Sequence, residues 1–425
     1  MNKSHKVVVA GLGYIGLPTA SLIATKGFRV VGVDVSQRIV DTINQGKIHI
    51  YEPDLDVLVR SAVNSGNLTA SMEPQEADTF IIAVPTPIRE DHKSDISAIE
   101  AAVHKIAPHL QPGNLIILES TSPVTTTDKI ADWLRELRKD LIVPRFTTEP
   151  AEPQPGQIFL AHCPERVLPG RILKELVDNT RIVGGIDPAS TRQATEFYKA
   201  FVNGKILSTN ARSAEMAKLT ENAFRDVNIA FANELSLICD ELSIDVWELI
   251  ELANHHPRVS ILQPGPGVGG HCIAVDPWFI VEAAPKNARL IRQAREVNLY
   301  KTDYMVNRIN ELAGNVYQPT IACLGLSFKA DIDDFRESPA LDIVARMDHN
   351  LFARVLVVEP HCQKLPPILA GNPKLELTGL EQALEQADMV ALLVNHKPFY
   401  EVAPEQLAGK QVIDTRGVWR FPHNR

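Results

Sequence analysis

The chain has 425 residues, of which 45% are hydrophobic and 22% charged, and its formal net charge is −9. This composition is typical of a globular protein with two or three domains, and it excludes the disordered and fibrous classes. The acidic balance also argues against a nucleic-acid-binding protein, because neutralising phosphates requires lysine and arginine.

The N-terminal half alternates between strand and helix patterns. Apolar strand-like runs lie at 6–10, 29–33, 79–84, 115–118, 158–161 and 181–183, and a helix is predicted over 96–110. This rhythm predicts a parallel, doubly wound sheet. The uncharged stretch 7–25 is long enough for a membrane helix. Its glycines and Pro18 favour a strand, a turn and a helix instead, so we expect no membrane segment.

The rest of the chain becomes helical and then alternates again. A proline-rich loop at 149–155 precedes long helical patterns over 212–242, 246–253 and 288–312. Buried strands are then predicted at 320–324, 354–358, 389–394 and 411–413. We therefore expect an α/β protein with two Rossmann-like doubly wound domains, joined by a long central helix and a helical connector.

The five cysteines indicate the redox compartment. Their number is odd and no CxxC pair occurs, which argues against a disulfide framework and against a zinc site made of thiolates. We expect a reducing, cytoplasmic location.

A GxGxxG motif follows the first strand. Gly11 serves the tight turn, Gly13 lets the backbone approach a pyrophosphate, and Gly16 permits close helix–strand packing. Asp34 follows the second strand, 18 residues after Gly16, where a ribose-binding carboxylate belongs. Its charge would repel a 2′-phosphate, which favours NAD over NADP, although the nearby Arg38 weakens that inference.

Thr86 and Thr121 lie in loops that follow two later strand runs, at 79–84 and 115–118. Such loops line the ligand crevice of a doubly wound sheet, so both threonines are candidate cofactor contacts. Ordinary turn chemistry accounts for them equally well.

The stretch Pro264–Cys272 carries four glycines and ends in a cysteine just before a predicted helix. Glycines expose backbone N–H groups and let a ligand approach the main chain. Helix N-terminal dipoles favour the thiolate, so Cys272 is predicted to be a nucleophile, with Asp276 one helical turn further on. The alternative for any single cysteine is a buried, unreactive side chain.

Lys218, Asn222 and Arg225 share one face of the long central helix. They suit an anionic or hydroxyl-rich ligand, but their spacing alone favours a solvated face. The adjacent histidines at 255–256 lack a second cluster of metal ligands, so we predict no metal site. Lys329 follows the first strand of the C-terminal domain and is a candidate phosphate contact. Because that turn lacks GxGxxG, a second dinucleotide is not expected.

Several long runs resemble the UDP-glucose/GDP-mannose 6-dehydrogenases. The runs are Gly11–Pro18, Ile48–Pro53, Cys163–Gly170, Lys218–Leu235 and His256–Phe279, within a likeness that covers nearly the whole chain. Inside the family they closely resemble the bacterial branch that oxidises UDP-N-acetyl-D-mannosamine. The resemblance implies a homodimer and an NAD-binding domain (1–205), a central helical domain (206–315) and a UDP-sugar-binding domain (316–425).

The resemblance further implies oxidation of a sugar C6 alcohol to a carboxylate through a cysteine thiohemiacetal and thioester, with two NAD⁺ consumed. It assigns catalysis to Cys272, Lys218, Asn222, Glu165 and Asp276. Val275 departs from the lysine that many relatives carry before that aspartate. Cofactor contacts are expected at Gly11, Gly13, Tyr14, Ile15, Gly16, Asp34, Arg38, Thr86, Thr121 and Arg336. Substrate contacts are expected at Arg166, Val167, Leu168, Lys218, Asn222, Arg225, His256, Arg258 (from the partner subunit), Gly269, Phe328 and Lys329.

Three alternatives remain open. A sibling enzyme would act on UDP-glucose, UDP-N-acetylglucosamine or GDP-mannose. A two-electron β-hydroxyacid dehydrogenase would need neither Cys272 nor a second α/β domain, and a non-catalytic nucleotide-sugar-binding protein would be expected to lose Cys272 or Lys218. The implied pathway is the supply of an aminouronate for a surface polysaccharide of the enterobacterial common antigen type.

Overall fold

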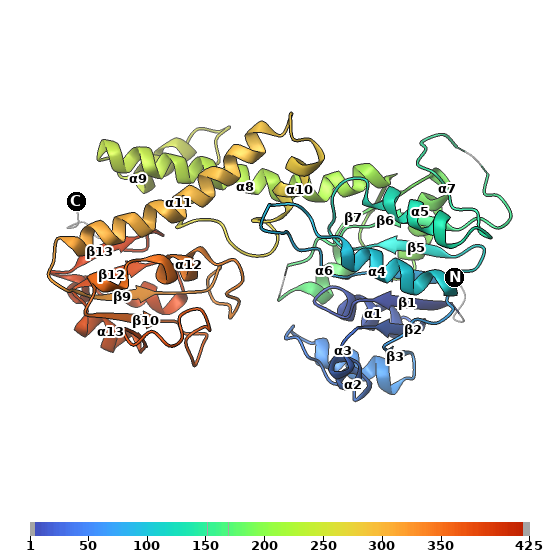
Figure 1. Ribbon diagram of the computed structural model, residues 1–425, viewed down its shortest axis with the longest axis horizontal. Coiled ribbons are helices and arrows are strands. Elements are labelled where there is room, and N and C mark those ends of the chain that lie inside the picture. Colours follow the sequence, from blue (N-terminus) through green and yellow to red (C-terminus); the bar gives the residue numbers. More distant parts are fainter. Residues whose placement is uncertain (1–4, 151, 169, 420–425) are drawn as a thin grey trace. The chain divides into compact units, whose positions relative to one another are not determined.

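The computed structural model describes residues 5–150, 152–168 and 170–419 (Figure 1). Ala151 and Pro169, which fall within two of the segments named above, lie outside the described residues. The chain divides into two compact units, one from Met1–Glu221 with Trp278–Pro285 and one from Asn222–Pro277 with Lys286–Arg425. Within the described residues, no helix combines the length and the apolar composition that a membrane span requires.

The first unit is built on an eight-stranded sheet with the strand order β3-β2-β1-β4-β5-β6-β7-β8. Its strands are β1 (Lys6–Ala10), β2 (Arg29–Val33), β3 (Leu68–Ser71), β4 (Thr79–Ile82), β5 (Leu115–Leu118), β6 (Phe159–His162), β7 (Arg181–Gly185) and β8 (Ile206–Asn210). Its helices are α1 (Gly16–Thr25), α2 (Gln37–Asn44), α3 (Leu55–Asn64), α4 (Ser97–Ile106), α5 (Thr126–Leu137), α6 (Ile172–Asp178) and α7 (Pro188–Tyr198), with a 3₁₀ turn, η1, at Ala107–His109.

Both faces of the central strands β1, β4 and β5 are buried, which explains why these strands are largely apolar runs. Val7 and Val9 of β1 face a core formed with α1, α2, α3, α6 and α7. Val8 and Ala10 face the opposite core, formed with α4 and α5. The doubly wound architecture predicted from the sequence is therefore confirmed.

One strand pair departs from the parallel arrangement expected for this sheet. β7 runs antiparallel to β6, with His162 opposite Gly184. The connection between β6 and β7 covers residues 163–180 and contains α6, which has seven residues. After α6 the chain re-enters the sheet from the edge at which β6 ended.

The second unit carries a five-stranded parallel sheet in the order β11-β10-β9-β12-β13. Its strands are β9 (Thr320–Leu324), β10 (Arg354–Val358), β11 (Leu375–Leu377), β12 (Met389–Leu392) and β13 (Gln411–Asp414). Its helices include α9 (Val246–Asn254), α11 (Arg289–Gly314), α12 (Pro339–Arg346), α13 (Leu380–Gln386) and α14 (Pro404–Leu407), with 3₁₀ turns η2 (His349–Leu351) and η3 (Lys397–Glu401). Helices cover both faces of this sheet as well.

Two helices are shared between the units. α8 (Ala211–Leu242) begins in the first unit and continues into the second, and its bounds agree with the helix predicted over 212–242. α10 (Asp276–Ala283) begins in the second unit, immediately after the glycine-rich stretch that contains Cys272.

Candidate active site

The glycine motif forms a turn in which each glycine has a different structural role. Gly11 has a φ of +92°, and a Cβ there would lie 2.4 Å from the carbonyl oxygen of Ala83. A Cβ on Gly16 would lie 1.8 Å from the carbonyl oxygen of Gly11, whereas one on Gly13 would meet nothing within 4 Å. The outer glycines are therefore required for packing, and the space beside Gly13 is open to a ligand.

Asp34 lies at the end of β2 with its carboxylate directed at the glycine turn. Oδ2 accepts a hydrogen bond from the Leu12 amide at 3.1 Å, and Oδ1 accepts one from the Ser36 amide at 2.9 Å. Each carboxylate oxygen has a second lone pair, so both ribose hydroxyls can still be bound. The open glycine turn, the start of α1 and this half-buried acid together fit a dinucleotide whose ribose lacks a 2′-phosphate.

The remaining predicted cofactor contacts lie in different environments. Tyr14 is 43% exposed, Ile15 is the N-cap of α1, and Arg38 is exposed in the first turn of α2. The structure brings Thr86 and Thr121 together, since the Thr86 hydroxyl donates to the Thr121 carbonyl at 2.5 Å. Arg336 belongs to the second unit, where its guanidinium pairs with the Asp334 carboxylate at 2.6 Å.

Glu165 lies in the loop after β6 and is buried. Its Oε2 accepts a hydrogen bond from Arg181 at 2.9 Å. The neighbouring Arg166 points elsewhere, toward Glu221 of α8 at 2.6 Å. Of the other predicted contacts in this loop, Val167 packs against the core and Leu168 is 50% exposed.

The polar face of α8 is only partly solvated. Asn222 is 9% exposed, Lys218 is half-buried and Arg225 is exposed. Asn222 Nδ2 donates to the Asp276 carboxylate at 2.6 Å. The interpretation as a solvated face therefore applies to Arg225 and not to Asn222.

Cys272 is exposed and lies one turn before α10. The Asp276 amide closes this turn by donating to the Cys272 carbonyl at 2.9 Å. The preceding glycines are tightly packed. A Cβ on Gly267 would lie 2.3 Å from the Thr302 hydroxyl, and one on Gly270 would lie 2.8 Å from the Phe328 ring. A Cβ on Gly269 would lie 2.3 Å from the Glu337 carbonyl oxygen. Packing therefore explains these glycines as well as ligand approach does, and it places Gly269 beside Phe328.

The last predicted contacts lie on the surface of the second unit. Lys329 is exposed beside Phe328 in the turn after β9. His256 and Arg258 are exposed in the segment after α9, where the Arg258 amide donates to His256 Nδ1 at 3.3 Å.

The turn after β9 resembles the glycine turn after β1, but the carboxylate that binds its backbone is buried. Gly325 has a φ of +90°, and the Leu326 amide donates to Glu359 at 2.7 Å, as the Leu12 amide donates to Asp34. Glu359 is fully buried and also contacts His396 Nε2 at 3.2 Å. Although burial opposes it, the hydrogen bonds from His396 and Leu326 hold the pKa of Glu359 below its usual value. This carboxylate is not presented to a ribose in the way that Asp34 is.

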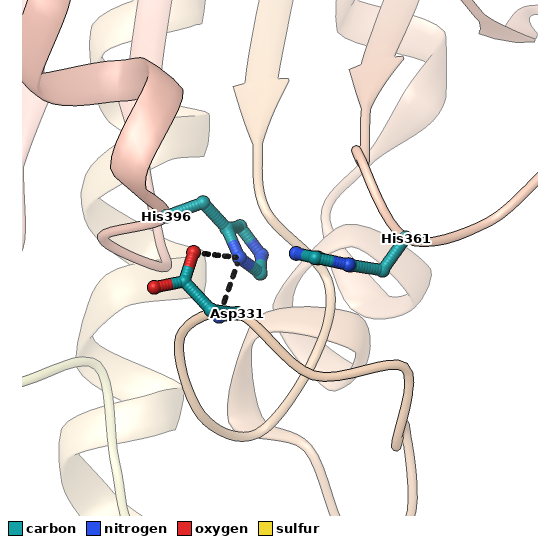
Figure 2. Close-up of side chains that lie close together, drawn as sticks. All are labelled: Asp331, His361 and His396. Atoms are coloured by element: carbon teal, nitrogen blue, oxygen red, sulfur yellow. Dashed lines mark hydrogen bonds and ion pairs between the residues drawn. The ribbon is translucent and has the colours of Figure 1, made fainter.

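Beside Glu359, the side chains of Asp331, His361 and His396 converge (Figure 2). Both ring nitrogens of His396 already have partners: Nδ1 accepts from the Asp331 amide at 2.9 Å, and Nε2 lies beside Glu359. A metal ion at Nδ1 would have to displace that amide. The arrangement is thus a hydrogen-bonded chain in which His396 joins Glu359 to the Asp331 turn.

Three buried residues of the first unit were not predicted from the sequence. Glu119 follows β5 and accepts from the Tyr198 hydroxyl at 2.7 Å, and Arg181 lies 3.8 Å from it. Neither ring nitrogen of His162 has a hydrogen-bond partner at good geometry among the described residues. Burial lowers the pKa of His162 to about 3, Lys218 adds to that shift, and the nearby Leu118 backbone opposes it. The position of Glu119 beside the candidate contact Thr121 could have indicated it, but a histidine that ends an apolar strand gives no signal.

Comparison with known proteins identifies the family. Profiles of the UDP-glucose/GDP-mannose dehydrogenase family match along the chain: the NAD binding domain at residues 5–202, the central domain at 212–300 and the UDP binding domain at 322–421. An NDP-N-acetyl-D-galactosaminuronic acid dehydrogenase of Ralstonia nicotianae is 57% identical over 97% of this chain and 96% of its own. A UDP-N-acetyl-D-mannosamine dehydrogenase of Campylobacter jejuni is 55% identical over 96% and 99%. A solved UDP-D-ManNAc dehydrogenase of Pyrococcus horikoshii, 37% identical, superposes with a TM-score of 0.84 over 98% of this chain and 96% of that one.

Proposed function

The chain belongs to the UDP-glucose/GDP-mannose dehydrogenase family, and we propose that it oxidises C6 of UDP-N-acetyl-D-mannosamine to the uronate. It is an NAD-dependent nucleotide-sugar dehydrogenase, with an NAD binding domain and a UDP binding domain. The particular sugar, the covalent intermediate and the roles of individual side chains are the proposed part.

The choice of sugar rests on relatives of nearly equal similarity. Relatives at 55% and 51% identity are UDP-N-acetyl-D-mannosamine dehydrogenases. Relatives at 57% are NDP-N-acetyl-D-galactosaminuronic acid dehydrogenases. Both names describe a 2-acetamido sugar, which favours an N-acetylhexosamine over glucose or mannose. A nucleotide-linked N-acetylgalactosamine is therefore the second candidate substrate.

One arrangement carries the proposal for the chemistry. Asn222 of α8 donates to the Asp276 carboxylate, and the Asp276 amide donates to the Cys272 carbonyl one turn earlier in the chain. An amide donor, a carboxylate and an exposed thiol are thus held together, and these are the groups that covalent oxidation of an aldehyde requires. The spacing of Lys218 one helical turn before Asn222 adds a cation to the same helix face.

Each of these groups has a defined task in the proposed mechanism. Two NAD⁺, bound one after the other, would each accept one of the two hydrides removed from C6. Lys218 and Asn222 stabilise the negative charge that develops on the C6 oxygen. Cys272 adds through Sγ to the C6 aldehyde, which gives a thiohemiacetal, and loss of the second hydride leaves a thioester on the enzyme. Glu165 takes a proton from the water that hydrolyses this thioester.

The stoichiometry of NADH tests this function. UDP-N-acetyl-D-mannosamine, the UDP-linked N-acetylgalactosamine and N-acetylglucosamine, UDP-glucose and GDP-mannose are each assayed with NAD⁺. We expect two NADH per sugar and the highest kcat/KM with UDP-N-acetyl-D-mannosamine. A higher value with another sugar overturns the substrate assignment. One NADH per sugar overturns the four-electron reaction, and binding without NADH overturns the enzymatic function.

The finer assignments made from the sequence and from the resemblance stay proposals. They comprise the division into residues 1–205, 206–315 and 316–425, a homodimer, a cytoplasmic location and a role in polysaccharides of the enterobacterial common antigen type. Size-exclusion chromatography with light scattering tests the dimer directly.

A further inference from the structure

A single buried guanidinium lies between two carboxylates in the first unit. Arg181, which is 4% exposed, donates to Glu165 at 2.9 Å and lies 3.8 Å from Glu119. It also stacks on the Tyr198 ring, 5.1 Å from its centroid. Both carboxylates are buried, so neither charge is strongly screened by water.

The antiparallel strand explains how Arg181 reaches this position. Arg181 is the first residue of β7, and β7 runs opposite to β6. Its first residue therefore lies at the edge where β6 ends and the loop with Glu165 begins. A parallel β7 would place the same residue at the opposite edge of the sheet. The reversal thus delivers a cation to the edge of the sheet that carries Thr121 and Glu165.

Groups from every neighbouring element face Glu119. They are Arg181 of β7, Tyr198 of α7, Thr19 of α1, and Cys163 and Glu165 after β6. Burial raises the pKa of Cys163 to about 12 and that of Tyr198 well above its usual value, so both stay neutral near pH 7. The charge of the cluster is therefore set by Arg181 and the two glutamates.

The two glutamates depend on the same cation. Burial raises the pKa of Glu119 to about 7, Arg181 opposes that shift, and the charge of Glu165 adds to it. Arg181 therefore interacts with two carboxylates at once, and a charge on Glu119 weakens the interaction between Arg181 and Glu165.

We propose that Arg181 is a positioning residue that orients Glu165 for water activation, and that a charge on Glu119 weakens this effect by competing for the same guanidinium. The inference rests on the role proposed for Glu165. As the water oxygen bonds to the thioester carbon, one water proton passes to Glu165. The C–S bond then breaks, and Cys272 leaves as a thiolate that is reprotonated from Glu165 or solvent.

The test measures thioester hydrolysis against pH in the full enzyme, by acid quenching and mass spectrometry of Cys272. Glu165→Gln comes first and is expected to accumulate the thioester. If the wild type forms no thioester, or if Glu165→Gln hydrolyses it normally, the proposed function has failed and not the role of Arg181.

Given that result, Glu119→Gln is the decisive variant. The substituted glutamine keeps the size of the side chain and can still accept from Tyr198, but it no longer competes for Arg181. Because the pKa of Glu119 is about 7, we expect the wild-type hydrolysis rate to change as Glu119 gains its charge near pH 7, and this change to be absent in Glu119→Gln. A lower melting temperature with the change near pH 7 still present would show that the cluster is only structural.

Variants of the guanidinium complete the test. Arg181→Met combined with Glu119→Gln removes a cation and an anion together, which guards against misfolding from two unpaired carboxylates. We expect hydrolysis to slow by about 10²-fold, within the usual contribution of a general base, and Arg181→Lys to restore part of the rate. Arg138→Lys is the control, because Arg138 also binds a carboxylate and backbone carbonyls, but at the far end of α5. Equal rates in the Arg181 double variant and this control would overturn the proposal.

Discussion

Asn222 and Asp276 are joined by a 2.6 Å hydrogen bond although 54 residues separate them in the chain. The bond fixes the amide of a central-helix side chain against the start of α10, one turn after Cys272. An amide nitrogen carries two N–H groups, so one can hold Asp276 while the other donates to a substrate oxygen.

Replacement of Lys218 or Asn222 by alanine should therefore cripple turnover without unfolding the chain. Alanine is the best helix former, so α8 should persist. Loss of one donor to a developing oxyanion typically costs about 10²–10³ in rate. Steady-state kcat and circular dichroism check this together. Thr220→Ala is the control on the same helix, since its hydroxyl donates to Met216 of α8. A normal kcat in the Asn222 variant would remove that side chain from the mechanism.

Features that depend on local backbone were predictable from the sequence. The glycine turn, the acid after β2 and the long helix follow from positive φ, spacing and helical period, and the structure has each of them. The Arg181 cluster was not predictable, because it depends on the reversed direction of β7. A sequence pattern shows that a strand exists but not which edge its first residue occupies.

The tightly packed glycines illustrate a different limit. Gly267, Gly269 and Gly270 suggested ligand approach, and the same residues also pack against Thr302, Glu337 and Phe328. Glycine is required wherever any atom comes close, whether it belongs to a ligand or to the protein. The sequence alone does not distinguish the two reasons.

Asp34 should control the choice between NAD⁺ and NADP⁺. Asp34→Ala should lower kcat/KM with NAD⁺ by about 10- to 100-fold, since a hydrogen bond to a charged group contributes about 1.5–3 kcal/mol. Asp34→Asn removes only the charge, so the ratio of NADP⁺ to NAD⁺ activity should rise. The exposed Asp41 of α2 supplies the control, Asp41→Asn. An unchanged cofactor ratio in Asp34→Asn would show that this charge does not discriminate.

His162 should make the first unit sensitive to acid. Its pKa is about 3 when folded, against 6.5 for an ordinary histidine. The unfolded chain therefore binds the extra proton below pH 6.5, and stability falls by about 1.4 kcal/mol for each pH unit between 6.5 and 3. His162→Leu should gain stability relative to the wild type as the pH falls. Urea unfolding at pH 7 and pH 5 measures this, and the exposed His104→Leu should show no such gain.

Glu215 should produce the opposite dependence. It accepts from the amides of Thr125 and Thr127 at the start of α5, and burial raises its pKa to about 7. The folded state then holds a proton that the unfolded state releases above pH 4.5, so this stabilisation is lost as the pH rises from 4.5 to 7. Glu119 has a similarly raised pKa and contributes to the same slope, so Glu215→Gln should reduce the slope, whereas the exposed Glu234→Gln should leave it unchanged. An unchanged slope in Glu215→Gln would assign the proton to other groups.

Cys272 should be the thiol that reacts first with iodoacetamide. It is exposed, whereas Cys362 is half-buried and burial raises the pKa of its thiol. Thiolate is the reactive form, so alkylation at Cys362 should be slower. Peptide mapping should place the first label on Cys272 together with loss of activity, and the UDP-sugar should protect. Inactivation that tracks label at Cys362 would contradict this.

Replacement of Cys272 by serine should separate the two oxidations. Serine has nearly the same size, but its hydroxyl has a much higher pKa than a thiol, and an ester hydrolyses more slowly than a thioester. The first hydride removal does not involve Sγ and should persist, so a single turnover should give up to one NADH per site. Steady formation of the uronate should collapse, and mass spectrometry should find sugar at the aldehyde level, free or as a hemiacetal of the introduced serine. Cys272→Ala should still bind the UDP-sugar by calorimetry, which shows that the pocket is intact. Uronate production at the wild-type rate by the serine variant would mean that the second oxidation proceeds without a covalent bond to Cys272.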